Sequence, residues 1–179
     1  MKPIAPMEAQ LAEQLPDGPG WQFEPKWDGF RCIAIRDGGD VALWSKSGKP
    51  LARYFPEVEA MFGRLKAKRF VIDGELLIAS EGAIAFDALQ LRLHPAASRV
   101  AKLAAETPAM LMAFDLLMSG RKTLAGDALS ARREALERML ASESEPALLL
   151  SPATTDRSEA LAWLERTGGA VDGVIPKRV

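Results

Sequence analysis

The chain has 179 residues, which is enough for one domain with a real hydrophobic core and hardly enough for two. Hydrophobic residues make up 48% and charged residues 26%, which excludes the disordered class of proteins. The formal net charge of −1 argues against strong nucleic-acid binding by overall positive charge, and a single cysteine excludes internal disulfides and thiolate metal clusters.

The first half of the chain is expected to form one helix, three strands, a second helix and a fourth strand. Helical spacing predicts a helix at Met7–Leu15, ended by the turn formers at Pro16–Gly20. Asp37–Asp40 predicts a hairpin turn, and Tyr54–Leu65 places its apolar residues on one helical face. Strands are expected at Trp21–Glu24, Phe30–Arg36, Val41–Trp44 and Phe70–Ala79.

In the second half, helices are expected at Phe86–Leu93, at Ser130–Ala141 with Ser130 as N-cap, and at Asp156–Thr167. Asp156 is the expected N-cap of the last helix, with Glu159 three residues on and Gly168-Gly169 beyond its end. Strands are expected at Met110–Met118 and Val171–Pro176. The irregular alternation predicts an α+β fold with mixed, mainly antiparallel sheets flanked by helices, in a single domain over residues 1–179.

No run of apolar residues approaches the ~18 needed for a membrane helix, and the N-terminus lacks the apolar core of a secretion signal. We therefore expect an intracellular protein without a membrane partner.

The segment Glu24–Arg31, which reads Glu-Pro-Lys-Trp-Asp-Gly-Phe-Arg, carries the first chemical signal. Its lysine, Lys26, lies among carboxylates, a glycine and an arginine. Such a lysine could attack phosphorus once its ammonium group has lost a proton. The alternative is an exposed lysine at the end of a strand, surrounded by solvated charges.

Acidic residues interrupt three strands that are otherwise apolar. Burying an unpaired carboxylate costs several kcal/mol, so a partner or a metal is expected. Asp73 and Glu75 are two residues apart and would point to the same side of a strand, which suits a hard cation or a sugar hydroxyl. An Asp-Gly hairpin turn with a solvated glutamate is the competing interpretation. Asp115 and Asp172 interrupt the other two strands.

Phe114, beside Asp115, is either a core ring or a surface on which a purine stacks. Two basic stretches could contact phosphates, although a solvated surface is the favoured interpretation of each. They contain Arg64, Lys66, Lys68 and Arg69, and then Arg92, Arg99 and Lys102. The chain has no glycine-rich phosphate loop, so a bound nucleotide would be held in another way.

Five segments, taken together and in order, resemble the successive motifs of the ATP-dependent DNA ligases. These segments are Glu24–Arg31, Ser45–Gly48, Asp73–Glu75, Phe114–Leu117 and Asp172–Lys177. The ligases belong to the lysine-dependent nucleotidyltransferases, which also include RNA ligases and messenger-RNA capping enzymes. Trp44–Glu57 resembles a DNA ligase more than a capping enzyme. The resemblance implies an ATP-grasp-like nucleotidyltransferase fold, the adenylation domain.

The resemblance also implies chemistry. Lys26 would attack the α-phosphate of ATP and carry AMP, which passes to the 5′-phosphate at a nick in duplex DNA, where the 3′-hydroxyl displaces it. The implied nucleotide-binding residues are Glu24, Trp27, Arg31, Lys46, Glu75, Phe114 and Lys177, with Arg31 and Lys46 contacting the nucleotide or the 5′-phosphate. Magnesium would be bound by Glu75 and Asp172, and the supporting residues would be Asp28, Gly29, Asp73 and Asp115. Such an enzyme would act in DNA repair, recombination or replication.

The chain departs from the family pattern at three points. Lys46 stands where arginine is usual, Asp172 stands where glutamate is usual, and the sequence ends before the family's K-x-K strand and OB-fold domain. We therefore expect an incomplete, monomeric adenylation domain with impaired activity. Two alternatives stay open: an RNA ligase or capping-type enzyme, and an inactive nucleotide-binding module.

Overall fold

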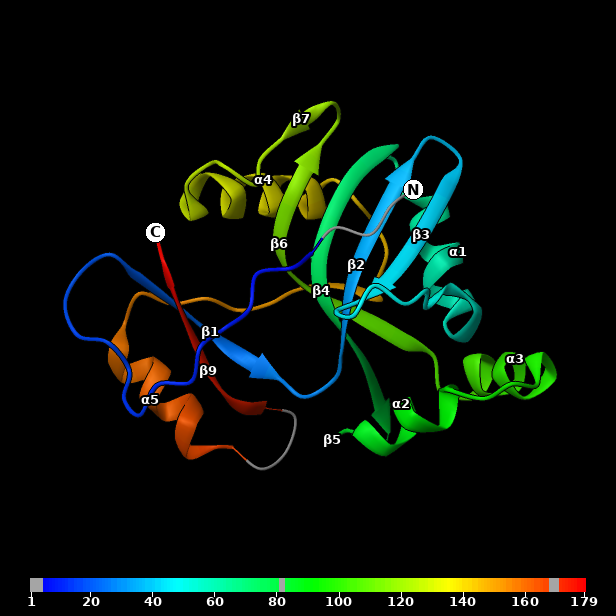
Figure 1. Cartoon of the computed structure of the whole chain (residues 1–179), viewed down its shortest axis with the longest axis horizontal. Helices are drawn as coiled ribbons and strands as arrows, with labels where there is room; N and C mark the ends of the chain where they lie inside the picture. The colour runs from blue at the N-terminus through cyan, green and yellow to red at the C-terminus, as the bar shows by residue number, and fades with distance from the viewer. Residues whose placement is uncertain (1–4, 81–82, 168–170) are drawn as a thin grey trace.

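The computed structural model describes residues 5–80, 83–167 and 171–179, and it consists of two β-sheets with helices around them (Figure 1). The larger sheet has the strand order β3-β2-β4-β6-β7, with β5 paired to β4 and β8 paired to β6. The smaller sheet pairs β1 (Trp21–Trp27) with β9 (Val171–Arg178). The strands of the larger sheet are β2 (Phe30–Asp37), β3 (Asp40–Ser45), β4 (Arg69–Ser80), β5 (Ala83–Ile84), β6 (Ala109–Ser119), β7 (Lys122–Thr123) and β8 (Leu148–Leu150).

The described strand pairs are antiparallel, except that β6 and β8 are parallel. The α+β prediction with mainly antiparallel sheets is therefore confirmed. Each strand expected from the sequence is present, and the predicted hairpin at Asp37–Asp40 joins β2 to β3.

The helices are 3₁₀-helix η1 (Ala52–Tyr54), α1 (Pro56–Arg64), α2 (Phe86–Arg92), α3 (Ala97–Glu106), α4 (Leu129–Ala141) and α5 (Arg157–Glu165). The main core lies against one face of the larger sheet, where Phe62 of α1 and Leu136 of α4 pack with Ile72 and Leu116. All four side chains are fully buried. Helix α5 packs instead against the small β1–β9 sheet (Figure 1).

The predicted helix at Met7–Leu15 is wrong, because these residues form neither helix nor strand. A helix this short is marginal unless an apolar face is buried. Here Met7 is 64% exposed and Leu11 is fully exposed, so there is no such face. The segment instead follows the surface, where Met7 O accepts a hydrogen bond from Arg31 and Leu15 O accepts one from Arg157.

Helix boundaries were predicted with mixed success. Helix α4 begins at Leu129, with Ala128 at its N-cap and no side-chain cap, so Ser130 is not the cap. Asp156 does cap α5, since its carboxylate accepts a hydrogen bond from Ser158 N at 2.8 Å. The predicted Gly168-Gly169 stop lies outside the described residues. Helix α3 was not expected.

The basic stretches are largely neutralised within the domain, but Arg92 is fully buried, so the interpretation as a solvated surface is wrong for this residue. The ion pairs are Arg64 with Glu145, Arg69 with Asp37, Arg92 with Glu57 and Lys102 with Glu106. Among the described helices, none combines the length and the apolar character needed to cross a membrane.

A buried ion pair attaches α4 to the sheet. Arg132 donates to both carboxylate oxygens of Asp115, at 2.8 and 3.0 Å, and both residues are less than a tenth exposed. Replacing Arg132 by methionine leaves the Asp115 carboxylate buried without its partner, so we expect a loss of about 3 kcal/mol of unfolding free energy in urea titrations.

The matched control is Arg138→Met, which breaks an exposed pair with Glu134 on the same helix and should leave the urea midpoint unchanged. An equal effect of the two substitutions would contradict the structural role given to the Asp115–Arg132 pair.

Candidate active site

The pairing of β1 with β9 brings Lys26 together with Asp172. Lys26 Nζ donates to Asp172 Oδ2 at 2.8 Å, and each side chain is about half exposed. In the β1–β9 register, Lys26 faces Gly173 whereas Trp27 faces Val171, so Asp172 is the extra residue of a β-bulge. A bulge re-aims a side chain, and here it allows the carboxylate of Asp172 to reach the lysine on the neighbouring strand.

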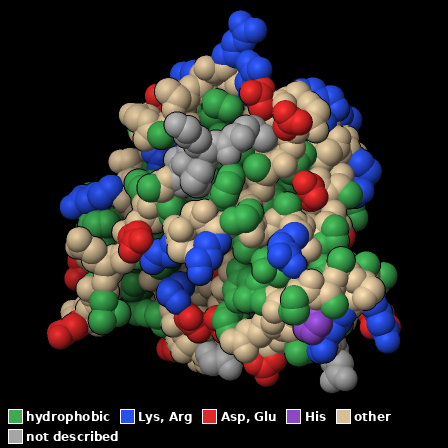
Figure 2. Space-filling view, turned by 45° about the vertical axis from the view of Figure 1, so that its right-hand side comes forward, with side chains coloured by type: hydrophobic (Ala, Val, Ile, Leu, Met, Phe, Trp, Pro, Cys, Tyr) green, Lys and Arg blue, Asp and Glu red, His purple; other side chains and the backbone are tan. Residues whose placement is uncertain are grey.

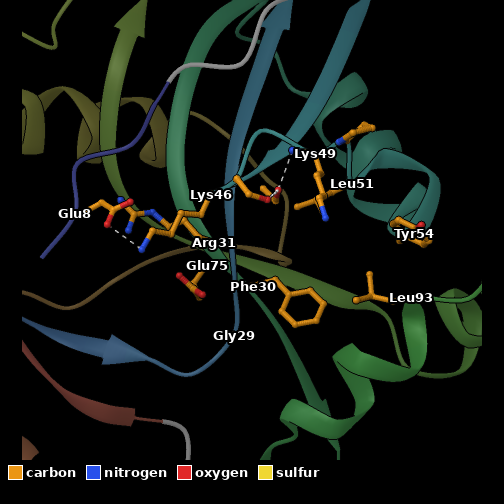
Figure 3. A pocket seen from close by; sticks show the side chains of 13 residues that line it. Glu8, Gly29, Phe30, Arg31, Lys46, Lys49, Leu51, Tyr54, Glu75 and Leu93 are labelled. Atoms are coloured by element: carbon orange, nitrogen blue, oxygen red, sulfur yellow. Dashed lines mark hydrogen bonds and ion pairs between the residues drawn. The ribbon is translucent and has the colours of Figure 1, made fainter.

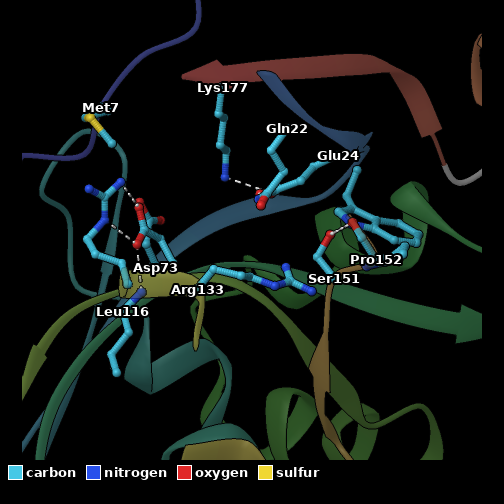
Figure 4. A network of polar contacts seen from close by, with 12 residues as sticks. Met7, Gln22, Glu24, Asp73, Leu116, Arg133, Ser151, Pro152 and Lys177 are labelled. Carbon is cyan, nitrogen blue, oxygen red and sulfur yellow. Dashed lines mark hydrogen bonds and ion pairs between the residues drawn. The ribbon is translucent and has the colours of Figure 1, made fainter. Parts of the chain in front are cut away.

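A second ion pair joins the same two strands. Lys177 Nζ donates to Glu24 Oε2 at 2.7 Å, and Gln22 donates to the other oxygen of Glu24 at the same distance (Figure 4). Glu24 is only 2% exposed, so the two contacts satisfy a buried carboxylate. Sequence reasoning missed Gln22, although residues two apart on a strand share a face.

Phe114, half-buried on β6, lies at the centre of the cationic side chains. The guanidinium carbon of Arg31 and the Nζ of Lys177 are each 4.7 Å from its ring centroid. Arg31 is held in place by Asp73, to which it donates twice, at 2.5 and 2.6 Å. Phe114 is therefore not simply a core ring: it offers an aromatic surface beside two phosphate-binding types of side chain.

Glu75 and Asp73 lie in the middle of β4, which excludes the hairpin-turn interpretation. Glu75 is the register partner of Arg31 on β2. Burial raises the pKa of Glu75 to about 8, although the charges of Arg31 and Lys26 act in the opposite direction. Burial also raises the pKa of Asp73, an effect that the hydrogen bonds from Arg31 partly offset.

Gly29 lets the connection between β1 and β2 approach β4 closely. A Cβ atom at this position would lie 2.3 Å from Leu76 O and 2.8 Å from Glu75 Cγ. Any side chain here would displace the strand that carries Glu75. Asp28, the residue before it, contributes to the raised pKa of Glu75.

We call Lys26, Asp172, Phe114, Lys177, Arg31 and Glu75 the Lys26 group. Lys46 is not part of it but lines an open pocket of about 740 Å³, which Arg31 and Glu75 also line (Figure 3). Its Nζ contacts Glu8 Oε2 at 3.2 Å. Sequence reasoning missed Glu8, because it placed that residue in a helix. The pocket is lined by Glu8, Gly29, Phe30, Arg31, Ser45, Lys46, Ser47, Lys49, Pro50, Leu51, Tyr54, Glu75 and Leu93.

Two of the expected site residues contact the scaffold instead of the Lys26 group. The indole nitrogen of Trp27 donates to Ser151 Oγ at 2.9 Å, which anchors the end of β1. The carboxylate of Asp115 binds Arg132, although its charge also contributes to the raised pKa of Asp73. Over the described ranges, no three acidic, histidine or cysteine residues are grouped as a metal site.

The raised pKa of Glu75 makes the stability of the domain depend on pH. The folded-state pKa of about 8 lies above the ordinary value of 4.5, so ionising Glu75 costs stability that is progressively lost as pH rises between these values. We expect Glu75→Gln to raise the melting temperature at about pH 9 and to have much less effect near pH 5 in thermal unfolding.

Glu13→Gln, which removes an exposed carboxylate from the irregular N-terminal segment, is the control and should have no effect at either pH. A Glu75→Gln difference that does not grow with pH would contradict the assigned environment of Glu75.

The comparisons with known proteins agree with this geometry. DNA ligase C2 of Mycolicibacterium smegmatis is 48% identical, covering 99% of this chain and 49% of its own length. DNA ligase C of Mycobacterium tuberculosis is 44% identical, covering 99% and 50%. A structure of mycobacterial DNA ligase D complexed with ATP and MES is 28% identical, with a TM-score of 0.68 over 88% of this chain and 48% of that chain.

The chain thus spans about half the length of the curated relatives it matches. A family model described as the ATP dependent DNA ligase domain matches residues 5–179. The chain belongs to the ATP-dependent DNA ligase domain family.

Proposed function

We propose that this domain performs the nucleotidyl-transfer chemistry of an ATP-dependent DNA ligase, with Lys26 as the nucleophile. The observation that carries the proposal is the position of Lys26. Its Nζ is held by Asp172, and its charge acts on Glu75, which faces Arg31 across the β2–β4 ladder. Family membership and the ATP named for the related mycobacterial ligase structure support ATP as the substrate.

The adenine of ATP would stack on Phe114. In the structure Arg31 and Lys177 lie against this ring, so the base would displace at least one of them. The displaced cation stays close enough to bind the phosphates, where a charge-assisted hydrogen bond replaces the cation–π contact. Glu24 would contact the base from its buried position on β1.

In the first chemical step, the neutral amine of Lys26 attacks the α-phosphorus of ATP. The N–P bond forms as the P–O bond to pyrophosphate breaks, which leaves lysyl-AMP. The contact with Asp172 is one between an ammonium and a carboxylate, so it must break before the lone pair becomes available. The half-exposed side chain gives the released proton a path to water.

In the two later steps, AMP passes from Lys26 to the 5′-phosphate at a nick, and the 3′-hydroxyl of the other end then attacks that phosphorus and releases AMP. Both are displacements at phosphorus, and positioning together with charge stabilisation supplies most of the catalysis. The process served would be DNA repair or recombination.

The raised pKa of Glu75 bears on the two roles considered for it. A carboxyl group with a pKa of about 8 is mostly protonated near neutral pH and can donate a hydrogen bond to a ribose hydroxyl. Binding magnesium through Glu75 would require the release of its proton, whereas the Asp172 carboxylate is half exposed beside Lys26, so Asp172 is the better candidate for magnesium. Mg²⁺ commonly binds one or two carboxylates and completes its shell with substrate phosphates and water. A site without a three-residue cluster in the described part of the chain therefore fits this ion, which would offset phosphate charge.

Lys26→Ala tests the proposal directly. Incubation of the native chain with ATP and magnesium should slowly add the mass of one AMP to part of the protein, in keeping with the impaired activity expected of an incomplete domain, whereas the variant should stay at its own mass; intact-protein mass spectrometry measures both. Lys102→Ala, on exposed helix α3, is the control and should gain AMP like the native chain. An adduct that persists in the Lys26 variant would refute the assignment, and the inactive-module alternative predicts no adduct in any of these proteins.

The acceptor distinguishes DNA ligation from the RNA ligase or capping alternative. We expect AMP to move from the adenylated chain to a nicked duplex of DNA at least about tenfold faster than to one of RNA, as a site shaped for one sugar discriminates by 1–3 kcal/mol. Gel analysis of labelled 5′-phosphate strands measures the rate. Faster transfer to RNA would favour the RNA ligase or capping alternative.

The resemblance also implies that a complete ligase of this family has a K-x-K strand and an OB-fold domain in addition to the region that this chain spans. This expectation stays a prediction.

A further inference from the structure

The pocket at Lys46 has two chemically different sides. Arg31, Lys46 and Lys49 contribute positive charge, whereas Tyr54 and Leu93 line it with apolar surface. In Figure 3, Glu8 and Lys46 lie at one side of the pocket, and Tyr54 and Leu93 lie at the other. Figure 2 likewise shows basic side chains beside a hydrophobic area, near the one histidine of the chain. Such a pocket suits a ligand that combines a phosphate with a bulky, less polar group.

The apolar side of the pocket includes a leucine that is largely exposed to solvent. Leu93, at the C-cap of α2, is 50% exposed although it borders a concave surface. Leu91 on the same helix is equally exposed but is not part of the pocket. Covering an exposed apolar side chain with a ligand is favourable, so Leu93 would contribute to the affinity for a ligand in this pocket.

An anion of the protein itself already occupies the charged side. The carboxylate of Glu8 contacts Lys46 at 3.2 Å, and Met7 O accepts a hydrogen bond from Arg31 at 3.3 Å. In the segment that carries these two residues, the large apolar side chains of Met7 and Leu11 are exposed. Polar contacts therefore hold it over the pocket, and a stronger anion can replace them.

The pocket adjoins the Lys26 group, since Arg31 and Glu75 belong to both. A phosphate at Lys46 would consequently lie next to the place where lysyl-AMP forms. In the proposed reaction, the phosphate that must approach lysyl-AMP is the 5′-phosphate of the acceptor strand.

We propose that the apolar wall of Tyr54 and Leu93 holds the terminal nucleoside of the acceptor strand, and that Glu8 occupies the adjoining phosphate position until the 5′-phosphate displaces it. The inference rests on the proposed function for the identity of the acceptor. It assigns Glu8 as a competitor for the phosphate, and Leu93 and Tyr54 as contacts of the nucleoside.

Glu8→Gln tests the competition. The substitution removes the competing charge, so affinity for a nicked DNA duplex with a 5′-phosphate should rise about two- to fivefold, the range expected for an exposed ion pair. Affinity for the same duplex with a 5′-hydroxyl should not change. Fluorescence anisotropy without ATP measures both. Glu13→Gln, on the same segment, is the control and should match the native chain.

Leu93→Ser tests the nucleoside wall. It should weaken binding of the 5′-phosphorylated nick about fivefold, because an apolar contact is lost. Leu91→Ser removes an equally exposed leucine from the same region and should leave the affinity unchanged. Urea titrations of both variants verify that each is folded.

Three results would overturn the proposal: equal affinity of the native chain for 5′-phosphate and 5′-hydroxyl nicks, an unchanged or lower affinity in Glu8→Gln, or equal effects at Leu91 and Leu93. Because these measurements need no ATP, they are independent of the lysyl-AMP assay. A chain that gains AMP on Lys26 but fails them keeps its proposed function and loses only this inference.

Discussion

The candidate site depends on the pairing of β1 with β9, two strands that lie almost at opposite ends of the chain. The ion pair of Lys26 with Asp172 spans 146 residues, and that of Lys177 with Glu24 spans 153. The small sheet they form is separate from the larger one. Lys26 and Lys177 therefore reach the site from one sheet, whereas Phe114, Glu75 and Arg31 reach it from the other.

Arg31 connects the two halves of this arrangement. Its hydrogen bonds to Asp73 fix the guanidinium within the larger sheet, and it lies against the Phe114 ring, which Lys177 of the small sheet also contacts. The same side chain borders the pocket of Lys46. One arginine thus faces both the proposed nucleotide position and the proposed acceptor position. The buried carboxylates around it hold the cations in place, so little reorganisation is needed when phosphates arrive.

Local signals predicted most of the fold. Hairpin turns and apolar alternation placed the strands, and Asp156 marked the start of α5 because a cap acts within one helical turn. The Met7–Leu15 helix failed because helical spacing says nothing about whether a partner surface exists. The motifs brought Lys26, Glu75 and Phe114 to attention. They could not supply Glu8 or Gln22, whose partners depend on how distant strands and an irregular segment are placed.

The bulge at Asp172 bears on the departure from the family pattern at this position. In a regular antiparallel ladder, Asp172 would pair with Trp27, and its side chain would point to the face opposite that of Gly173 and Lys26. The bulge removes this constraint, because Asp172 is left without a register partner between Gly173 and Val171. Its carboxylate then reaches Lys26 Nζ at 2.8 Å although aspartate is one methylene shorter than the usual glutamate. The position of the backbone, rather than the length of the side chain, makes this contact.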